Sequence, residues 1–310
     1  QLLCSSRVAR TVDKLERTLL HWACVHAAHQ CIESLPARPV HFQTLLDAYA
    51  GQLTSRDCKG KTPVMLLLET GVELQKKKWE EKQVAMFHLP LEWIHMLQKN
   101  PTVAAIEDST GRLPIHAAVA AGLSTNHVAS WIELHPNALL HVDESLQVAL
   151  HAALCAPWSA RLQTAESVHL LLVRSYEKLG TVVDGRLAMK MEDGDGMYPI
   201  HYACRNDASV EVMQVMMKYY PQAALLQTPS GDLPIHCLLS ETLLDHPKKN
   251  ESVRQKIKLM VPPLLTDAKK LSVVDSTFGM MPLHICVYFS AADYSELLRM
   301  LELYPEAAMH

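Results

Sequence analysis

The stretch Leu113-Pro114-Ile115-His116-Ala117-Ala118 recurs with small changes along the chain. Close copies read Tyr198-Pro199-Ile200-His201-Tyr202-Ala203, Leu233-Pro234-Ile235-His236-Cys237-Leu238 and Met281-Pro282-Leu283-His284-Ile285-Cys286. Looser copies surround His21, Met65 and His151, so the phrase occurs about seven times. A proline followed by apolar residues suits the first turn of a buried helix, because the missing N–H has no helical partner there. The recurrence therefore predicts a series of similar helical units.

Turn residues precede the copies at fixed positions. Eight residues before the histidine position stand Asp13, Asp57, Asp108, Asp143 and Asp193. Five residues before it stand Gly60, Gly111, Gly196, Gly231 and Gly279. A carboxylate can accept hydrogen bonds from nearby backbone N–H groups, and glycine adopts a positive φ without strain. The spacing Asp-x-x-Gly therefore predicts a tight loop between consecutive units.

A second amphipathic helix is predicted after the short helix of each copy, and residues 128–134, 210–219 and 294–303 are clear examples. The predicted second helices end at prolines, namely Pro101, Pro136, Pro221 and Pro305. Proline cannot continue a helix, and it biases the preceding residue away from helical geometry. Each unit is therefore expected to be a helix–turn–helix.

Together these features resemble the ankyrin repeat, whose signature is T-P-L-H-x-A. Threonine remains only in the first two copies, and Met65 replaces the histidine once. The resemblance implies an all-α ankyrin-repeat solenoid of about seven helix–turn–helix units in a single domain. The expected units span residues 10–56, 57–107, 108–142, 143–192, 193–227, 228–275 and 276–310.

The resemblance also implies a structural role for the recurring histidine, which in this family hydrogen-bonds the backbone of neighbouring loops. The histidines concerned are His21, His116, His151, His201, His236 and His284. No chemistry is expected of them.

The spacing of the units is irregular. Successive histidine positions are separated by 44, 51, 35, 50, 35 and 48 residues, whereas an ankyrin unit takes about 33. Alternate units therefore carry roughly 15 extra residues, near positions 73–83, 157–166 and 245–256. These polar segments either lie between the two helices of a unit or extend one or both of them. In either arrangement we expect them to project from one edge of the solenoid, commonly the binding face.

The composition excludes several classes of protein. With 310 residues, 49% of them apolar, the chain can bury a sizeable core and is not a disordered polypeptide. A net charge of -4 favours neither nucleic acid nor an anionic membrane. No apolar run approaches the roughly 20 residues that span a bilayer. Both ends look cut from a longer protein, since the chain begins at Gln1 and stops within a repeat.

The eight cysteines contain no CxxC pair, and several lie in apolar helical stretches. They are interpreted as reduced thiols of an intracellular protein, cytoplasmic or nuclear.

Candidate metal and catalytic residues are few. The densest group of possible zinc ligands comprises His21, Cys24, His26, His29 and Cys31, but it lacks a recognised spacing, so we expect no metal. Asp193-Gly194-Asp195-Gly196 resembles the start of a calcium loop without its remaining ligands, and a connecting turn is expected instead. No catalytic or phosphate-binding motif occurs, so we expect neither an enzyme nor a cofactor.

Basic residues gather in two of the inserts. They are Lys76, Lys77 and Lys78, and then Lys248, Lys249, Arg254, Lys256 and Lys258. Glutamates are interspersed among them, so solvated faces are the favoured interpretation and basic binding patches the alternative.

Partners of ankyrin-type proteins usually contact the inter-unit loops and the exposed side of the first helices. The resemblance therefore implies a set of partner-binding residues just after the histidine position: Trp22, His26, Tyr202, Arg205, Asn206, Tyr288 and Phe289. Aromatic residues and arginine are the types that anchor protein interfaces. We expect the four aromatics to be exposed; the alternative is that end units or inserts cover them.

The sequence thus favours a protein–protein interaction scaffold or adaptor whose partner it does not identify. A first alternative is the regulatory or targeting arm of a larger multidomain enzyme or channel. A metal-binding protein is a minor alternative.

Overall fold

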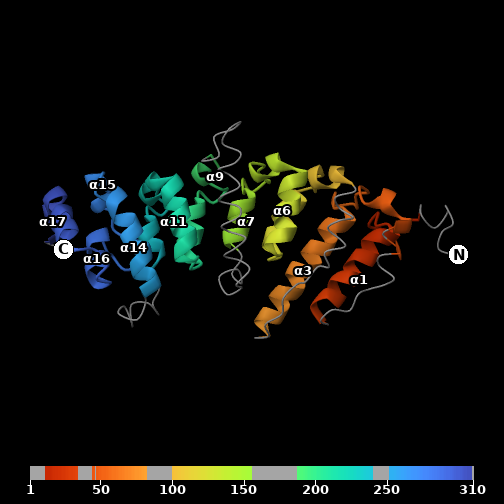
Figure 1. Cartoon of the computed structure of the whole chain (residues 1–310), viewed down its shortest axis with the longest axis horizontal. Coiled ribbons are helices and arrows are strands. Elements are labelled where there is room, and N and C mark those ends of the chain that lie inside the picture. Colours follow the sequence, from red (N-terminus) through yellow and green to blue (C-terminus); the bar gives the residue numbers. More distant parts are fainter. Residues whose placement is uncertain are drawn as a thin grey trace. The chain divides into compact units, whose positions relative to one another are not determined.

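A computed structural model describes residues 11–33, 44–45, 47–81, 100–155, 187–239 and 251–308 (Figure 1). All the regular secondary structure in these residues is helical. The chain divides into two compact parts, Gln1–Ala153 and Leu154–His310, which are called here the N-terminal and C-terminal halves. None of the helices within these described residues is both long and apolar enough to cross a bilayer.

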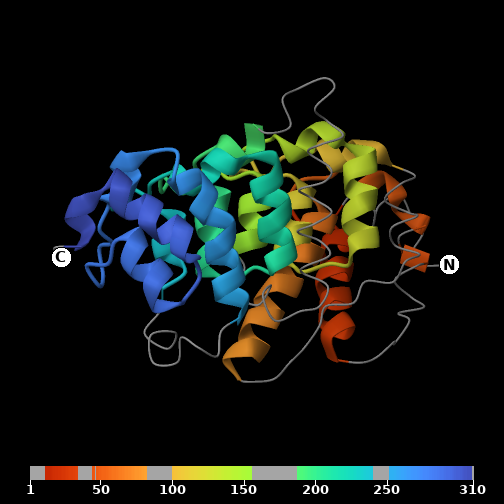
Figure 2. The same cartoon turned by 60° about the vertical axis from the view of Figure 1, so that its left-hand side comes forward.

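In the N-terminal half, successive helices pack on one another. Its α-helices are α1 (Leu19–Glu33), α3 (Pro63–Glu80), α5 (Pro114–Ala120) and α6 (Thr125–Leu134), and α7 (Ala149–Cys155) follows at its end. Its 3-10 turns are η3 (Ala50–Gln52), η4 (Pro101–Ala105) and η5 (Pro136–Leu139). Helix α1 lies beside α3 in both views (Figures 1 and 2), α3 contacts α5, and α5 contacts α6.

The C-terminal half repeats this arrangement. Its first helices are α9 (Leu187–Lys190), α10 (Pro199–Arg205), α11 (Val210–Tyr219) and α12 (Pro234–Cys237). The later helices are α14 (Glu251–Leu264), α15 (Ala268–Leu271), α16 (Pro282–Tyr288) and α17 (Tyr294–Leu303), with 3-10 turns η7 (Pro221–Leu225) and η9 (Pro305–Ala308). Helix α11 lies beside α14 in both views, while α10 contacts α12 and α12 contacts α16 (Figures 1 and 2).

The signature prolines begin the first helices, as their chemistry predicts. Pro114, Pro199, Pro234 and Pro282 each occupy the first turn, and the residue before each is extended. Two of the second helices, α11 and α17, begin at polar caps: Ser209 Oγ accepts from Val212 N at 3.3 Å, and Asp293 Oδ1 accepts from Glu296 N at 2.8 Å. Such a cap satisfies a backbone donor that the helix itself leaves free.

The predicted second helices 210–219 and 294–303 coincide with α11 and α17. Helix α6 begins at Thr125, three residues before the predicted start at 128, because the chain leaves its extended geometry immediately after Ser124 (φ -62°, ψ 159°). The residue before each terminal proline has non-helical geometry, for example Tyr220 with ψ 77°. The proline then opens a 3-10 turn, so the chain continues as η5, η7 or η9.

The core is lined by the apolar residue that precedes each signature histidine. Leu20, Ile115, Leu150, Ile200 and Ile235 are all at most 2% exposed. Burial of one such side chain contributes about 1.5–3 kcal/mol. Because no single helix pair can bury this face alone, the repeats are stable only when stacked.

The polar segments of the long units extend helices wherever the structure describes them. Residues 73–80 continue the first helix α3, and residues 251–256 form the start of the second helix α14. The third such segment, 157–166, lies outside the described residues, as do Lys248 and Lys249.

The interpretation of Lys256 as part of a solvated face is wrong. Its side chain is fully buried in α14, together with Val253, Ile257 and Met260. These positions follow the i, i+3, i+4, i+7 pattern that places residues on one helix face, and α14 packs on α11. The ammonium is paired with the Asp207 carboxylate. The helical period therefore determines that Lys256 lies on the buried face of α14, whereas its charged sequence neighbours had indicated that it would be exposed to solvent.

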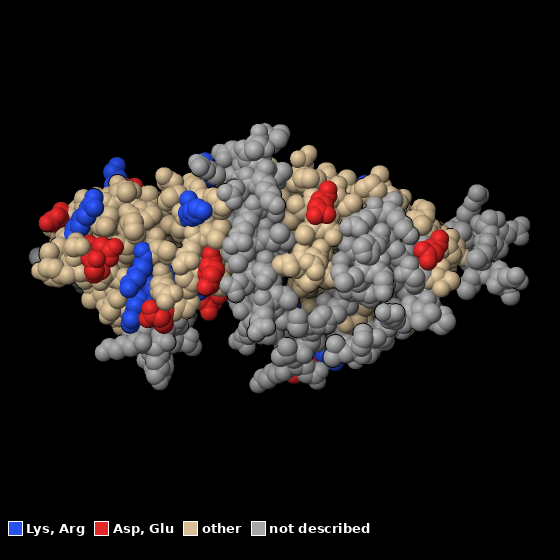
Figure 3. Space-filling view, in the orientation of Figure 1, with Lys and Arg blue, Asp and Glu red and all other residues tan. Residues whose placement is uncertain are grey.

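Arg254 also departs from that interpretation, because its Nε donates to the carbonyl oxygen of Phe289 at 3.0 Å. Lys258 is exposed, as expected. On the face seen in Figure 3, the basic and acidic side chains of the C-terminal half are interspersed rather than separated.

Candidate partner-binding surface

The inter-repeat loops are organised by the recurring aspartate. One carboxylate oxygen of Asp57 accepts from Lys59 N and Lys61 N, both at 2.9 Å. The same pair of bonds, to the residues two and four positions later, occurs at Asp13, Asp108, Asp143 and Asp193. Thr228 takes this position in one loop, where its hydroxyl accepts from Asp232 N. Each loop is thus a rigid turn that presents its tip in a defined conformation.

Backbone hydrogen bonds join consecutive loops of the N-terminal half. Cys58 N donates to Leu15 O at 2.9 Å, Ser109 N to Lys59 O at 3.0 Å, and Glu144 N to Thr110 O at 3.0 Å. Each such bond contributes about 0.5–1.5 kcal/mol. The loop tips of this half therefore form a continuous hydrogen-bonded surface.

The six signature histidines cap the first helices. The Nδ1 atom of each accepts from the backbone N–H three residues earlier, at 3.0–3.3 Å, in His21, His116, His151, His201, His236 and His284. An Nδ1 that accepts requires the proton to sit on Nε2 of the neutral ring. In His21, His116 and His201 the Nε2 atom lies 3.0–3.2 Å from a carbonyl oxygen near the next loop. Where Met65 replaces histidine, Thr62 Oγ1 accepts from its N–H instead.

Burial favours the neutral form of four of these rings, those of His21, His116, His201 and His236. Desolvation lowers the pKa of His21, His116 and His201 below the ordinary value of 6.5, and lowers that of His236 to about 4. The unfolded chain binds protons to these rings near pH 6.5. The free energy of unfolding therefore falls as the pH drops from about 6.5 through the lowered values.

We expect acid to destabilise the protein between pH 6.5 and 4. For His236 alone, the difference between the two pKa values corresponds to at most about 3 kcal/mol below pH 4. Urea unfolding midpoints at pH 7.5, 5.5 and 4.5 measure the effect. His236→Met, the residue that the chain itself uses at position 65, should flatten the profile in this window. A profile unchanged in that variant would contradict the assignment.

Two of the expected interface aromatics bond the aspartate of their own loop. The Trp22 indole Nε1 donates to Asp13 Oδ2 at 3.0 Å, and the Tyr202 hydroxyl donates to Asp193 Oδ2 at 2.7 Å. Burial and this bond raise the pKa of Tyr202. Trp22 remains 48% exposed, whereas Tyr202 is only 7% exposed. The expectation of exposure therefore holds for Trp22 and is wrong for Tyr202, whose ring fills the loop–helix junction.

In a second pair of expected interface aromatics, one ring is likewise exposed and the other is buried. Tyr288 is 37% exposed, but Phe289 is 1% exposed, and their rings meet edge to face at 5.3 Å. Phe289 is the residue immediately after α16, and its side chain is buried in the core. The expected exposure of Phe289 is therefore also wrong.

The remaining expected interface residues lie at or near the surface. His26 and Arg205 are exposed. Asn206 is half-buried, and its side-chain amide donates to the Leu154 carbonyl oxygen at 2.7 Å, so it holds the end of α10 against the chain at Leu154.

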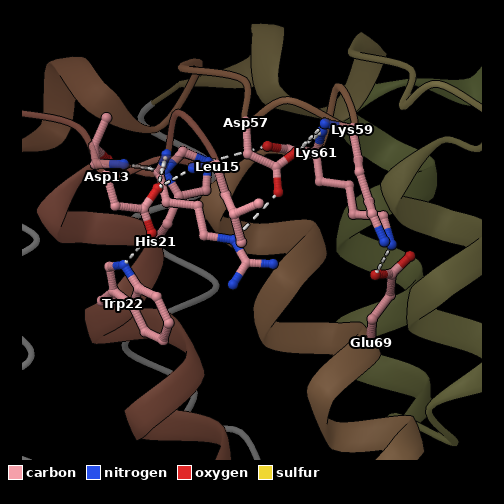
Figure 4. A network of polar contacts seen from close by, with 10 residues as sticks. Asp13, Leu15, His21, Trp22, Asp57, Lys59, Lys61 and Glu69 are labelled. Carbon is pink, nitrogen blue, oxygen red and sulfur yellow. Dashed lines mark hydrogen bonds and ion pairs between the residues drawn. The ribbon is translucent and has the colours of Figure 1, made fainter.

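Trp22 lies at one end of a polar network at the start of the N-terminal half, which it joins through Asp13 (Figure 4). The Arg17 guanidinium lies over the Trp22 ring at 5.3 Å, and Arg17 Nε donates to Asp57 Oδ2 at 3.5 Å. In the next repeat, Lys61 forms an ion pair with Glu69 of α3. Arg17 was not identified from the sequence. The recurrence of a basic residue four positions after the loop aspartate, at Arg17, Lys61 and Arg112, is the signal that could have revealed it.

The candidate metal residues do not form a site. Within the described residues, histidine, cysteine and acidic side chains make no group of three or more that could hold a metal ion. Burial raises the pKa of Cys24, and raises that of Cys31 to about 11, which disfavours the thiolate that zinc requires. Both carboxylate oxygens of Asp193 accept hydrogen bonds from the protein, as expected of a connecting turn.

No family model matches the sequence, and no curated protein sequence matches it. Among solved structures, 170 chains are similar. One is the crystal structure of the ankyrin repeat domain of Bcl-3, described as a unique member of the IkappaB protein family. It superposes with a TM-score of 0.50 at 15% identity and covers 92% of this chain and 98% of that chain. With the aspartate loops, proline-started helices and histidine caps described above, this likeness establishes that the chain has the ankyrin-repeat fold, an all-α solenoid.

Proposed function

We propose that this chain is a protein-binding module whose partner docks on the loop and first-helix surface around Trp22. The observation that carries the proposal is the state of this side chain. It is about half exposed, yet its indole N–H is bonded to Asp13 and its ring is covered by the Arg17 guanidinium. Tryptophan and arginine, together with tyrosine, are the residues most enriched at energetically dominant positions of interfaces.

Holding the ring in place favours binding. An exposed side chain normally loses about 0.5–1.5 kcal/mol of rotamer freedom when a partner immobilises it. The Asp13 and Arg17 contacts impose much of that order before the partner arrives. The apolar side chains of Val12 and Leu15, in the same loop, are also exposed and enlarge the surface.

The same fold offers a second, weaker candidate surface in the C-terminal half. Arg205 and Tyr288 are exposed there, at the position four residues after the signature histidine. Tyr202 and Phe289 contribute little contact area to it, because they are buried.

We expect Trp22→Ala to weaken partner binding by about 30-fold or more, the loss typical of a dominant interface residue. A partner is first captured from cell lysate on the immobilised chain, identified by mass spectrometry, purified, and titrated against each variant by calorimetry. Trp22→Phe keeps an aromatic ring but loses the indole N–H, so an intermediate loss of affinity is expected.

Tyr202→Phe is the matched control, because it removes the equivalent bond to a loop aspartate at a buried aromatic. It should lower the melting temperature without changing affinity. A partner that binds Trp22→Ala as tightly as the parent would exclude this surface. A loss confined to Arg205→Ala and Tyr288→Ala would move the site to the C-terminal half.

A further inference from the structure

The N-terminal half carries a row of cations at one repeat position. Arg17, Lys61 and Arg112 each stand four residues after the aspartate of their loop. The next loop of this half has Gln147 there, so the row ends at Arg112. The cation row, as these three residues are called below, follows the loop tips that the backbone bonds hold together.

The two arginines of the row are held by buried carboxylates. Arg17 Nε lies 3.5 Å from Asp57 Oδ2, and Arg112 Nε lies 3.1 Å from Asp143 Oδ2. The carboxylates are 0% and 3% exposed, whereas the arginine side chains are 19% and 47% exposed. Each aspartate is itself fixed by two backbone N–H groups. Both guanidinium groups are therefore oriented from the inside of the protein.

In both arginines the bond to the aspartate is made by Nε, so it does not use the two terminal nitrogens. In the described part of the chain, no protein acceptor bonds the terminal nitrogens of Arg17 or Arg112. Lys61, between them, is paired with Glu69. The row thus presents two forked donors separated by a cation that is already neutralised, and a fork is the geometry that binds a carboxylate in bidentate fashion.

We propose that the cation row binds an extended acidic peptide segment, with one carboxylate on Arg17 and another on Arg112. The proposal rests on the proposed function, since it names the chemistry of a partner that also contacts Trp22. Packed helices are about 10 Å apart, so two repeats span about 20 Å. An extended chain rises about 3.3 Å per residue, and the span equals about six residues. Side chains six residues apart point to the same side of an extended strand.

A discrete pair of carboxylates fits this surface better than a continuous polyanion. The exposed Glu16 lies in the loop of Arg17, and the exposed Glu144 lies in the loop that follows Arg112. Both would oppose closely spaced phosphates. The net charge of -4 likewise gives no general attraction for nucleic acid.

The test uses two peptides of 12 residues in a glycine–serine background. In one the two glutamates are six residues apart, and in the other they are five apart, which points them to opposite sides. Binding to the whole chain is followed by NMR through the Trp22 indole and the arginine Nε–H signals. We expect the six-residue peptide to bind about three- to tenfold more tightly, and Arg17→Gln or Arg112→Gln to abolish this preference.

Two control variants separate the effects of net charge and of folding from the effect of the guanidinium geometry. Lys258→Gln removes the same charge from an exposed position in the C-terminal half and should leave both dissociation constants unchanged. Arg17→Lys keeps the charge but loses the fork, so it should also lose the preference while its melting temperature shows that the loop is intact.

The outcomes separate this inference from the proposed function. Equal binding of the two peptides, unaffected by Arg17→Gln and Arg112→Gln, would overturn the acidic-peptide proposal, and the effect of Trp22→Ala on partner capture would stand or fall by itself. A single-stranded oligonucleotide of 12 thymidines is the third probe. Tighter binding of that oligonucleotide through the same arginines would replace the peptide by a nucleic acid.

Discussion

Asp207→Asn is expected to lower the free energy of unfolding by about 2–3 kcal/mol, because it leaves the ammonium of Lys256 buried without its counter-charge. The Lys256 side chain is fully buried in α14, and the carboxylate of Asp207 is its ion-pair partner. That carboxylate is itself largely exposed, so water screens the pair and the loss lies below that of a fully buried one. An asparagine here would keep the backbone conformation, since Asp207 has φ +54° and asparagine tolerates it. Urea denaturation followed by circular dichroism measures the loss.

A double-mutant cycle isolates the ion pair. Lys256→Met removes the charge but keeps an unbranched side chain of similar length, so its own cost should lie within about 1 kcal/mol of zero. In that background Asp207→Asn should be nearly neutral. An equal cost of Asp207→Asn in both backgrounds would show that the carboxylate acts on the backbone turn and not on Lys256.

Gly60→Ala is expected to destabilise the protein by about 2–5 kcal/mol, from two sources. Gly60 has φ +71°, which costs an alanine about 1–2 kcal/mol. A Cβ there would lie 2.9 Å from the backbone nitrogen of Ser109 in the next loop. That nitrogen donates to Lys59 O at 3.0 Å, so the loop cannot retreat without breaking a bond between repeats. Such overpacking adds about 1–3 kcal/mol.

Gly279→Ala is the matched control. Gly279 has nearly the same φ, +69°, but nothing lies within 4 Å of an added Cβ. Only the conformational cost of about 1–2 kcal/mol should remain. Equal losses in the two variants, measured by thermal unfolding, would show that contact between loops does not contribute. In the loop that begins at Asp143, Leu146 occupies the position that Gly60 and Gly279 take in theirs. It has φ +56°, and its side chain is exposed.

The fold was largely predictable because the features that determine it are local. A proline that begins a helix, an aspartate that closes a turn and a proline that ends a helix each act within a few residues. Periodic repetition then indicates stacking, since no unit can bury its apolar face alone. The start of α6 was predicted three residues too late, because Ser124 ends the preceding extended segment and the hydrophobic pattern does not reveal where that segment ends.

The candidate surface was only partly predictable. The residues just after the signature histidine do lie on the first helices, but the same position holds an exposed Trp22 and a buried Tyr202. Both rings bond their loop aspartate, and the exposure of each depends on the elements packed around it. Phe289 is buried for the same kind of reason.

The sequence by itself determined the helix–turn–helix units, the aspartate loops and the first turns at Pro114 and its counterparts, because these depend on residues within one or two turns of each other. Only the tertiary structure decided that Lys256 is buried, that Arg17 reaches Asp57 forty residues away and that Phe289 faces the core. These outcomes depend on which repeat faces each side chain. Whether a side chain is buried depends on the repeat that packs against it as well as on the residue itself, and the sequence of one repeat does not specify the repeat beside it.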